Sequence, residues 1–186
     1  MLASSFPIKT SRLALRPYET GDLAFLHSMF SREDVCRYLP WTPMDLDQAQ
    51  AKLEQRVRQT HIETDGDAFV LIAEESDTGR TVGEFMLRLK SLASRQGELG
   101  WSLHPDAQGR GFATEAAREM LRIGFDELGL HRIVAGCDSR NTASLRVMER
   151  LGMRREAEFV DYEYVKGDWA SESVCALLES EWRAQV

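Results

Sequence analysis

The hydrophobic positions in the first third of the chain predict one strand followed by two helices. Apolar and polar residues alternate over residues 10–18 (TSRLALRPY), as they do in a half-buried strand. Apolar positions then recur at helical spacing as far as Phe30, and we expect Asp22 to cap this helix. After the proline-broken loop RYLPWTP, a second helix is predicted from Asp45, because apolar residues recur on one face up to Val57.

Three consecutive strands are predicted in the middle of the chain, over residues 67–75, 80–90 and 96–105. The residues that separate the first two, SDTG, tolerate the tight geometry of a turn, so we expect an antiparallel meander. The best-defined helix follows, because apolar residues recur at helical spacing throughout residues 113–128. Gly129 is expected to end this helix.

The last third of the chain predicts a strand over residues 131–137, a helix over 142–151, and a hairpin of 154–165 with 169–179 around the turn KGD. A strand, a helix and a strand in that order imply a parallel crossover within an otherwise antiparallel sheet. We therefore predict an α/β (α+β) fold, with a mixed, mostly antiparallel central sheet and helices on both faces.

Length and composition are those of an ordinary globular protein. The 186 residues are expected to form a single domain over residues 1–186, with 43% hydrophobic and 28% charged residues. No apolar run approaches the roughly 20 residues that span a bilayer. The start of the chain, MLASSFPIKTSR, lacks the basic and apolar segments of a signal peptide. We expect a cytoplasmic protein without a membrane partner.

The net charge and the spacing of the cysteine and histidine residues limit which ligands and partners are expected. A net charge of −7 disfavours nonspecific binding to nucleic acid and mildly favours a cationic partner. Cys36, Cys137 and Cys175 form no C-x-x-C pair, and the four histidines share no ligand spacing. We expect neither a disulfide framework nor a metal, and we interpret the cysteines as small buried apolar residues.

The stretch HPDAQGRGFATEA, residues 104–116, places two glycines and an arginine at the start of the best-defined helix. A helix start has four unpaired N–H groups and about half a positive charge, so it can bind an anion through the backbone. Gly109 and Gly111 would permit close approach, and Arg110 would supply a local cation. These features favour a phosphate or pyrophosphate ligand; alternatively, the glycines only shape the turn from strand to helix.

Two well-known phosphate-binding motifs do not fit this stretch. The P-loop pattern is absent, and a dinucleotide fingerprint beginning at Gly109 and Gly111 has Thr114 where its third glycine belongs. The pattern Gln108-x-x-Gly111-x-Ala113, in contrast, resembles the Q/R-x-x-G-x-G/A loop with which the GNAT N-acetyltransferase superfamily binds the pyrophosphate of acyl-CoA.

The resemblance to the GNAT superfamily covers nearly the whole chain. The segment LHRIVAGCDSRNTASLRVMERLGM is similar to the second CoA-contacting segment of the superfamily, with N-x-x-S at Asn141 and Ser144. The segments IKTSRLALRPYETGD and CRYLPWTP resemble the branch that contains RimJ and RimL, the ribosomal-protein N-terminal acetyltransferases. Members of that branch often form dimers, so the resemblance is compatible with a homodimer, but the sequence itself does not reveal the oligomeric state.

The resemblance implies acetyl-CoA as the cosubstrate, no metal, and a fold in which two central strands splay apart in a V after GELGWSL. The pantetheine arm would pair with the backbone of this strand and contact Asn141, and one backbone N–H of the strand would stabilise the oxyanion. The strand residues would be Trp101, Ser102 and Leu103, and the pyrophosphate would bind main-chain N–H groups of Gln108, Gly109, Arg110, Gly111, Phe112, Ala113 and Thr114.

Acetyl transfer to an amine needs one group that takes a proton from the amine and another that protonates the departing thiolate. Several superfamily members place the base at the start of the splayed strand, so Glu98 is our first choice. Glu84 is the alternative and Glu163 stays open, and each carboxylate could equally lie on a solvated surface. By resemblance, Ser144 would protonate the sulfur, although small hydroxyl residues are also common in a first helical turn.

The sequence favours an acetyl-CoA-dependent N-acetyltransferase acting on a primary amine by direct attack in a ternary complex. The favoured acceptor is the N-terminal α-amine of a protein or peptide. Tyr38 and Trp41 stand where the branch places a substrate-side loop, and they would line the acceptor pocket or else pack as core aromatics. The alternatives are a small amine, polyamine or amino-acid acceptor, a succinyl donor, or a noncatalytic acyl-CoA-binding module.

Overall fold

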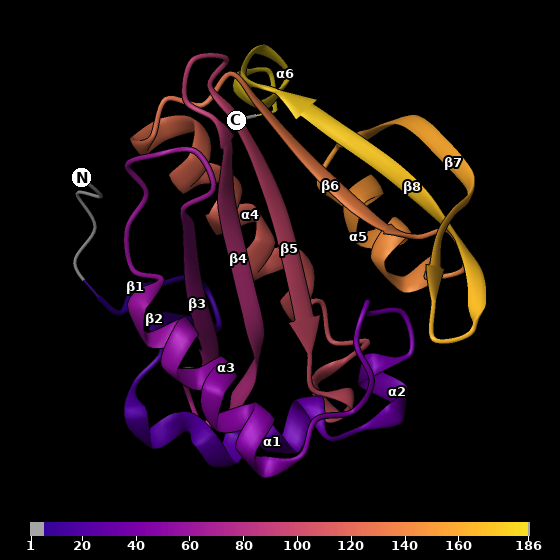
Figure 1. Cartoon of the computed structure of the whole chain (residues 1–186). Helices are drawn as coiled ribbons and strands as arrows, with labels where there is room; N and C mark the ends of the chain where they lie inside the picture. The colour runs from indigo at the N-terminus through magenta and orange to yellow at the C-terminus, as the bar shows by residue number, and fades with distance from the viewer. Residues whose placement is uncertain (1–5, 186) are drawn as a thin grey trace.

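A twisted sheet of eight strands crosses the molecule in the order β1-β2-β3-β4-β5-β6-β8-β7 (Figure 1). The computed structural model describes residues 6–185, so residues 1–5, on which part of the signal-peptide expectation falls, lie outside it. The periodicity predicts all of these strands except the two-residue β1. Their bounds are β1 Ile8–Lys9, β2 Leu13–Pro17, β3 Ala68–Glu75, β4 Thr81–Ser91, β5 Gln96–Leu103, β6 Arg132–Asp138, β7 Arg154–Val165 and β8 Asp168–Leu178.

The strand pairing confirms the predicted mixed sheet. Every neighbouring pair is antiparallel except β5 and β6, which run parallel and are joined through the helix α4 (Phe112–Arg122). The meander of β3, β4 and β5 and the closing hairpin of β7 and β8 are therefore as expected.

The two halves of the sheet separate soon after β5 and β6 meet. These strands pair only from Gln96 with Arg132 to Glu98 with Val134. Beyond that point β5 stays paired with β4, and β6 stays paired with β8 as far as Asp138. The result is the V-shaped splay that the resemblance implied, and it opens downward in Figure 1 between β5 and β6.

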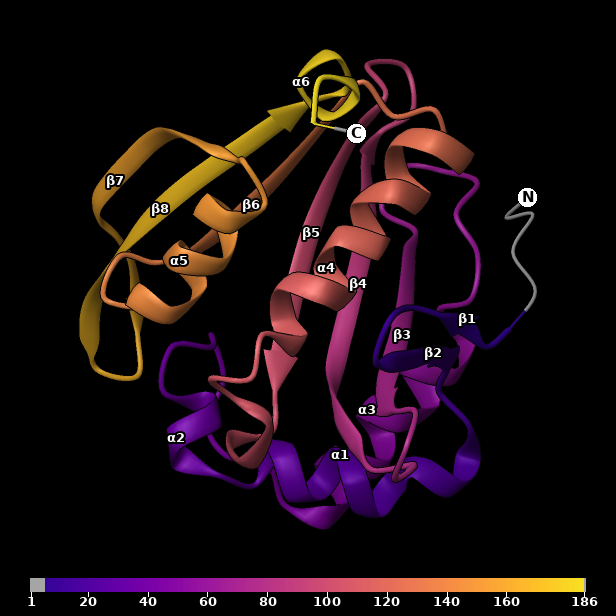
Figure 2. The ribbon, with the colours of Figure 1, turned by 180° about the vertical axis from the view of Figure 1, so that it is seen from behind.

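Helices cover both faces of the sheet, as the pattern predicted. Figure 1 shows α1 and α3 on the face toward the viewer, and Figure 2, seen from behind, shows α4 and α5 on the opposite face, each against one arm of the V. None of the helices within residues 6–185 is long and apolar enough to cross a membrane. The remaining bounds are α1 Leu23–Phe30, α2 Glu33–Cys36, α3 Leu46–Arg58, α5 Thr142–Arg150 and α6 Glu179–Arg183, with short 3-10 turns at Thr20–Asp22 and Pro105–Ala107.

Two local expectations need correction. Asp22 precedes α1, but its side chain does not cap that helix: the carboxylate accepts two 2.8 Å hydrogen bonds from Arg16 and one from the Glu19 N–H. The helix predicted over residues 113–128 is not α-helical throughout, because after Arg122 it continues as a π-helical turn over Ile123–Glu127.

A buried ion pair joins α3 to the central sheet. Arg56 donates to both oxygens of Glu84 at 2.8 and 3.1 Å, and the Tyr18 hydroxyl donates to the same carboxylate at 2.9 Å. The side chains of Arg56 and Glu84 are only 8% and 7% exposed. Burial, together with the negative charge of Glu84, raises the pKa of Tyr18 well above its ordinary value. Each charge therefore depends on the other for compensation.

Replacing Glu84 with alanine would leave the Arg56 guanidinium buried without a counter-charge. We expect Glu84→Ala to lower the free energy of unfolding by about 3–5 kcal/mol, whereas the apolar double variant Glu84→Leu/Arg56→Met should lose far less. Urea denaturation followed by circular dichroism measures both. A loss below about 1 kcal/mol for Glu84→Ala, the size typical of an exposed pair, would contradict the buried arrangement.

Candidate active site

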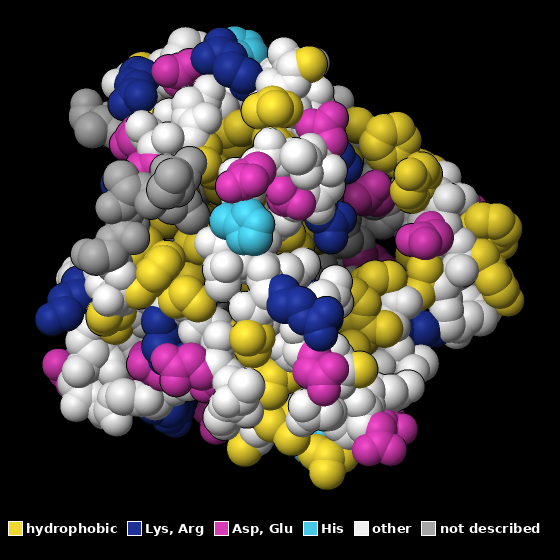
Figure 3. Space-filling view, turned by 60° about the vertical axis from the view of Figure 1, so that its left-hand side comes forward, with side chains coloured by type: hydrophobic (Ala, Val, Ile, Leu, Met, Phe, Trp, Pro, Cys, Tyr) yellow, Lys and Arg dark blue, Asp and Glu magenta, His cyan; other side chains and the backbone are white. Residues whose placement is uncertain are grey.

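The opening of the V holds a cavity of about 690 Å³. Its walls come from β4, β5, β6, α5, the loop after α2 and the β7–β8 hairpin, and the hairpin residue Lys166 donates a hydrogen bond to the Cys36 carbonyl at the end of α2. On the face shown in Figure 3, acidic and basic side chains are interspersed over the surface. The cavity brings together many sequence-predicted residues: Tyr38, Trp41, Glu84, Glu98, Trp101, Ser102, Asn141, Ser144 and Glu163.

The glycine-containing loop lies outside the cavity lining, between β5 and α4. Gly109 and Gly111 have left-handed backbones, with φ of 74° and 83°. The first helical hydrogen bond back to this loop runs from the Glu115 N–H to the Gly111 carbonyl, at 3.1 Å. Within residues 6–185, the N–H groups of residues 112–114 have no acceptor. Because no Cβ crowds the glycines, this loop offers accessible backbone donors that suit a phosphate group.

Arg110 is not the free cation that the sequence suggested. Its guanidinium donates to both oxygens of Glu75 at 2.7 and 2.8 Å and lies over the Phe112 ring. This pairing lowers the pKa of Glu75. Arg12, which the sequence argument missed, also reaches the loop, since it donates to the Arg110 carbonyl at 3.0 Å. Arg12 reaches the loop because β2, which begins at the next residue, packs beside α4. No local sequence signal could have identified this contact.

Asn141 and Ser144 occupy the N-terminal turn of α5. The Asn141 side-chain oxygen accepts a 3.0 Å hydrogen bond from the Ser144 N–H, so Asn141 caps the helix. Both side chains also line the cavity, and the Ser144 hydroxyl makes no hydrogen bond within residues 6–185. The capping role is therefore present, and it leaves the hydroxyl available as a proton donor.

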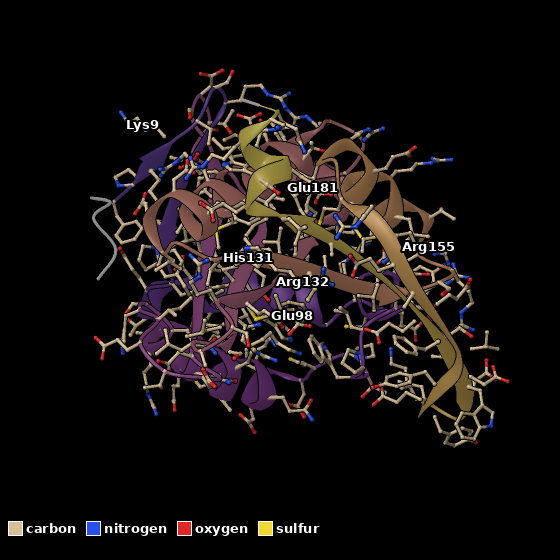
Figure 4. All side chains as sticks on the ribbon, turned by 90° about the horizontal axis from the view of Figure 1, so that it is seen from above. Lys9, Glu98, His131, Arg132, Arg155 and Glu181 are labelled. Carbon is tan, nitrogen blue, oxygen red and sulfur yellow. The ribbon has the colours of Figure 1, made fainter. Side chains whose placement is uncertain are left out.

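The predicted carboxylates differ in their partners. Glu84 reaches the cavity wall, but Arg56 and Tyr18 occupy both of its oxygens. The Glu98 carboxylate lies 3.5 Å from the Lys90 ammonium and 3.8 Å from Arg88. In Figure 4, the labels of Glu98 and Arg132 mark the region where β5 and β6 are still paired.

Glu172 on β8 is a cavity-lining carboxylate that the sequence argument missed. Burial raises the pKa of Glu172, and the negative charges of Glu98 and Glu163 add to the effect. The only sequence signal was its position within the alternating pattern WASESVCALLE, where it falls on the face opposite the buried Cys175.

The cavity wall formed by α3 and the loop after α2 combines aromatic rings with a lysine. Trp41 packs against Phe30 with ring centroids 6.0 Å apart, so it is both a core aromatic and a cavity residue. Tyr38 lies on the same loop as Trp41 and also lines the cavity. The Lys52 ammonium lies 4.2 Å from the Trp41 ring centroid and 4.9 Å from that of Phe30. Burial, and secondarily the charge of Arg56, lowers the pKa of Lys52 to about 8. Lys52 was not identified from the sequence.

The three cysteines are free thiols. Cys36 and Cys175 are buried, as predicted, whereas Cys137 is half-buried and lines the cavity. Burial raises the pKa of Cys137 to about 12, which keeps the thiol protonated and makes it a poor nucleophile near neutral pH.

The chain belongs to the acetyltransferase (GNAT) domain family, which its residues 12–154 match. It is 32% identical to the uncharacterized N-acetyltransferase YnaD of Bacillus subtilis, over 94% of this chain and 98% of that one. A GNAT-family acetyltransferase from Bacillus anthracis has a similar structure, with a TM-score of 0.83, 31% identity, and coverage of 94% and 99%.

A spermidine N-acetyltransferase from Vibrio cholerae, solved in complex with CoA and spermine, shares the fold with a TM-score of 0.80. It is 22% identical and covers 94% of this chain and 99% of its own. The eight-stranded splayed sheet is therefore the GNAT fold, and this protein is an N-acetyltransferase.

The chain has four lysines, and we expect Lys52 to titrate near pH 8 because burial disfavours its charged form. Reductive ¹³C-methylation followed by NMR titration would give one dimethyl-lysine signal with this midpoint, and Lys52→Gln would remove it. The other lysines serve as internal references. If every signal titrated near the ordinary lysine value of 10.5, the burial of this ammonium would be contradicted.

Proposed function

We propose that this enzyme transfers the acetyl group of acetyl-CoA to a primary amine, with the N-terminal α-amine of a protein or peptide as the favoured acceptor. The observation that carries this proposal is the V itself. At its open end the cavity collects candidate proton-transfer groups, and the donor-rich loop stands where β5 leads into α4. Acetyl-CoA, when bound, would supply an activated thioester.

The residues present fit acetyl-CoA along one side of the V. Beyond Glu98, β5 pairs only with β4, so the edge formed by Trp101, Ser102 and Leu103 has backbone groups free to pair with an extended amide chain. The main-chain N–H groups of residues 108–114 would hold the pyrophosphate. Thr114 also has a buried hydroxyl without a hydrogen-bond partner in the described chain.

Proton transfer in this proposal uses side chains around the same opening. Ser144 would protonate the departing sulfur, because its hydroxyl is uncommitted at the cavity wall. Glu98 stays a candidate for the base. Glu84 is less suited, because both of its carboxylate oxygens already accept hydrogen bonds from the buried Arg56 guanidinium.

The cavity is not lined by acidic side chains alone. Arg37, Lys52 and Arg88 place positive charge on the same walls as the carboxylates, so the cavity is not a uniformly negative site for a polyamine. A peptide, which offers one ammonium beside neutral amides, suits this mixed lining. The RimJ/RimL-like assignment rests on the resemblance of CRYLPWTP, whose Tyr38 and Trp41 line this cavity. A polyamine acceptor is the second candidate, supported by the fold shared with the spermidine enzyme.

Acetyl-CoA should stabilise the folded protein. At 100 times its Kd a ligand adds about 2.7 kcal/mol to the free energy of unfolding, which raises Tm by several degrees in a domain of this size. Differential scanning fluorimetry with acetyl-CoA, NAD and ATP measures this. A shift with NAD or ATP but none with acetyl-CoA would assign the loop to a different nucleotide and contradict the proposal.

Two glycine variants separate loop binding from backbone strain. Gly109 and Gly66 both have left-handed backbones, with φ of 74° and 93°, and open space at the Cβ position. The Gly66 N–H donates to the Leu89 carbonyl, near the end of β4 that is remote from the glycine-containing loop. Both Gly→Ala variants should lose about 1–2 kcal/mol of stability, but only Gly109→Ala should reduce the acetyl-CoA shift. Equal shifts in both variants would exclude a binding role for the Gly109 backbone.

The charge at position 52 should influence acceptor choice. We expect the wild-type enzyme to acetylate a peptide with a free N-terminus in preference to spermidine, and Lys52→Glu to move the ratio of kcat/KM values toward spermidine by about tenfold. Lys52→Gln is the matched neutral control and should move the ratio less. Mass spectrometry of the two products gives the ratio. An unchanged ratio in Lys52→Glu would remove Lys52 from acceptor selection.

A further inference from the structure

Glu172 lies at the point where the sheet opens. The last β5–β6 pair joins Glu98 to Val134, and Gly136 is the second residue beyond it on β6. Gly136 pairs with Val174 of β8, and Glu172 is two residues before Val174. Since side chains two apart along a strand share a face, Glu98 and Glu172 project from the same face of the sheet, on the two arms of the V.

The Glu172 carboxylate occupies space that a side chain at position 136 would fill. A Cβ added at Gly136 would lie 2.4 Å from Glu172 Oε1, closer than real contacts allow. The carboxylate therefore lies directly against the backbone of β6 inside the opening, and it lines the same cavity as Glu98 and Ser144. A larger residue at 136 would displace it.

Glu172 and Glu163 have no hydrogen-bond or ion-pair partner within residues 6–185, in contrast to the other acids near the opening. Glu84 is held by Arg56, Asp138 accepts from Arg140 at 2.7 and 2.9 Å, and Glu98 has cations nearby. No hydrogen bond or ion pair engages the Glu172 carboxylate within residues 6–185.

The charged and titratable groups that face Glu172 come from four strands. They are Lys90 on β4, Glu98 on β5, Asp138 on β6 and Glu163 on β7, and Asp138 is the cross-strand neighbour of Glu172 but is bound by Arg140. The Cys137 thiol on β6 also lies nearby. Burial and the carboxylates of Glu98 and Glu163 raise the pKa of Glu172, whereas Lys90 lowers it. The balance makes this carboxylate a better proton acceptor than an ordinary surface glutamate.

We propose that Glu172, rather than Glu98, is the general base that takes the proton from the acceptor ammonium. This inference rests on the proposed acetyl transfer to an amine. The ammonium gives one proton to Glu172, and the freed nitrogen lone pair forms a bond to the acetyl carbon, whose bond to sulfur breaks with its electron pair. The nitrogen then loses a second proton to water as the amide forms, and the sulfur gains a proton from Ser144. Water returns a proton to the Ser144 oxygen, and Glu172 releases its proton to water, so the cycle yields the amide, the free thiol of CoA and one proton.

The test compares Glu172→Gln, Glu98→Gln and Glu158→Gln, an exposed hairpin glutamate paired with Arg155. Profiles of kcat/KM against pH are measured with acetyl-CoA and the best amine of a panel containing a peptide, spermidine and an amino acid. We expect Glu172→Gln to lower kcat/KM by about 100-fold or more and to abolish the acidic limb. Glu98→Gln should keep that limb but move it to lower pH, because a negative neighbour is lost. Glu158→Gln should match the wild type.

Glu172→Gln activity within about threefold of the wild type, or an unchanged acidic limb, would overturn the inference while leaving the proposed function intact. A wild-type protein that acetylates no amine of the panel would overturn both. Tm and the Kd for acetyl-CoA of each variant show that the fold and the donor site are preserved.

Gly136→Ala provides a second, independent variant that keeps both carboxylates. The added methyl group should displace Glu172 and lower kcat/KM about tenfold, and it should have little further effect in a Glu172→Gln background. Full additivity of the two changes would contradict the proposed placement.

NMR titration of ¹³C-labelled glutamate carboxyl groups tests the inference without measuring enzyme activity. One carboxyl group should titrate above the ordinary glutamate range and disappear in Glu172→Gln. Its absence from the wild type would also overturn the inference.

Discussion

The site depends on the end of the hydrogen-bond ladder between β5 and β6, at Glu98 and Val134. Beyond this pair each strand keeps its other neighbour, because β5 is held by β4 as far as Leu103 and β6 by β8 as far as Asp138. The facing edges of the opening therefore have backbone groups without a strand partner, and such groups need a partner from water or a ligand. The cavity borders this opening, and the glycine loop follows directly from the end of β5.

The two kinds of recognition around the opening use different chemistry. In the proposed function, donor recognition would rely on main-chain N–H groups at the start of α4, and these need glycines for access rather than any particular side chain. Acceptor recognition would rely on side chains from β4, α3, the loop after α2 and the closing hairpin. The donor site can therefore be described by a short motif, whereas the acceptor site can vary without changing the fold.

Three carboxylates reach the same face of the sheet in different electrostatic states. Glu84 is compensated by a buried guanidinium, and Asp138 is bound by Arg140, which lowers its pKa. Glu172 is left half-buried beside other negative charge, and its pKa rises. Environment, rather than residue type, decides which of them can exchange a proton near neutral pH.

The sequence by itself determined the succession of the longer strands and helices, the parallel crossover and the glycine loop, because periodicity and turn residues act over a few neighbouring positions. The short elements β1, α2 and α6 were not predicted. It also proposed Asn141, Ser144, Tyr38 and Trp41 as candidate site residues, and all four line the cavity. Only the tertiary structure decided the electrostatics. Arg12, just before β2, donates to the loop, and Arg110 forms an ion pair with Glu75. Lys52 and Glu172 line the cavity from α3 and β8. These contacts join residues far apart in the chain, and burial, which shifts a pKa, exists only after the elements have packed.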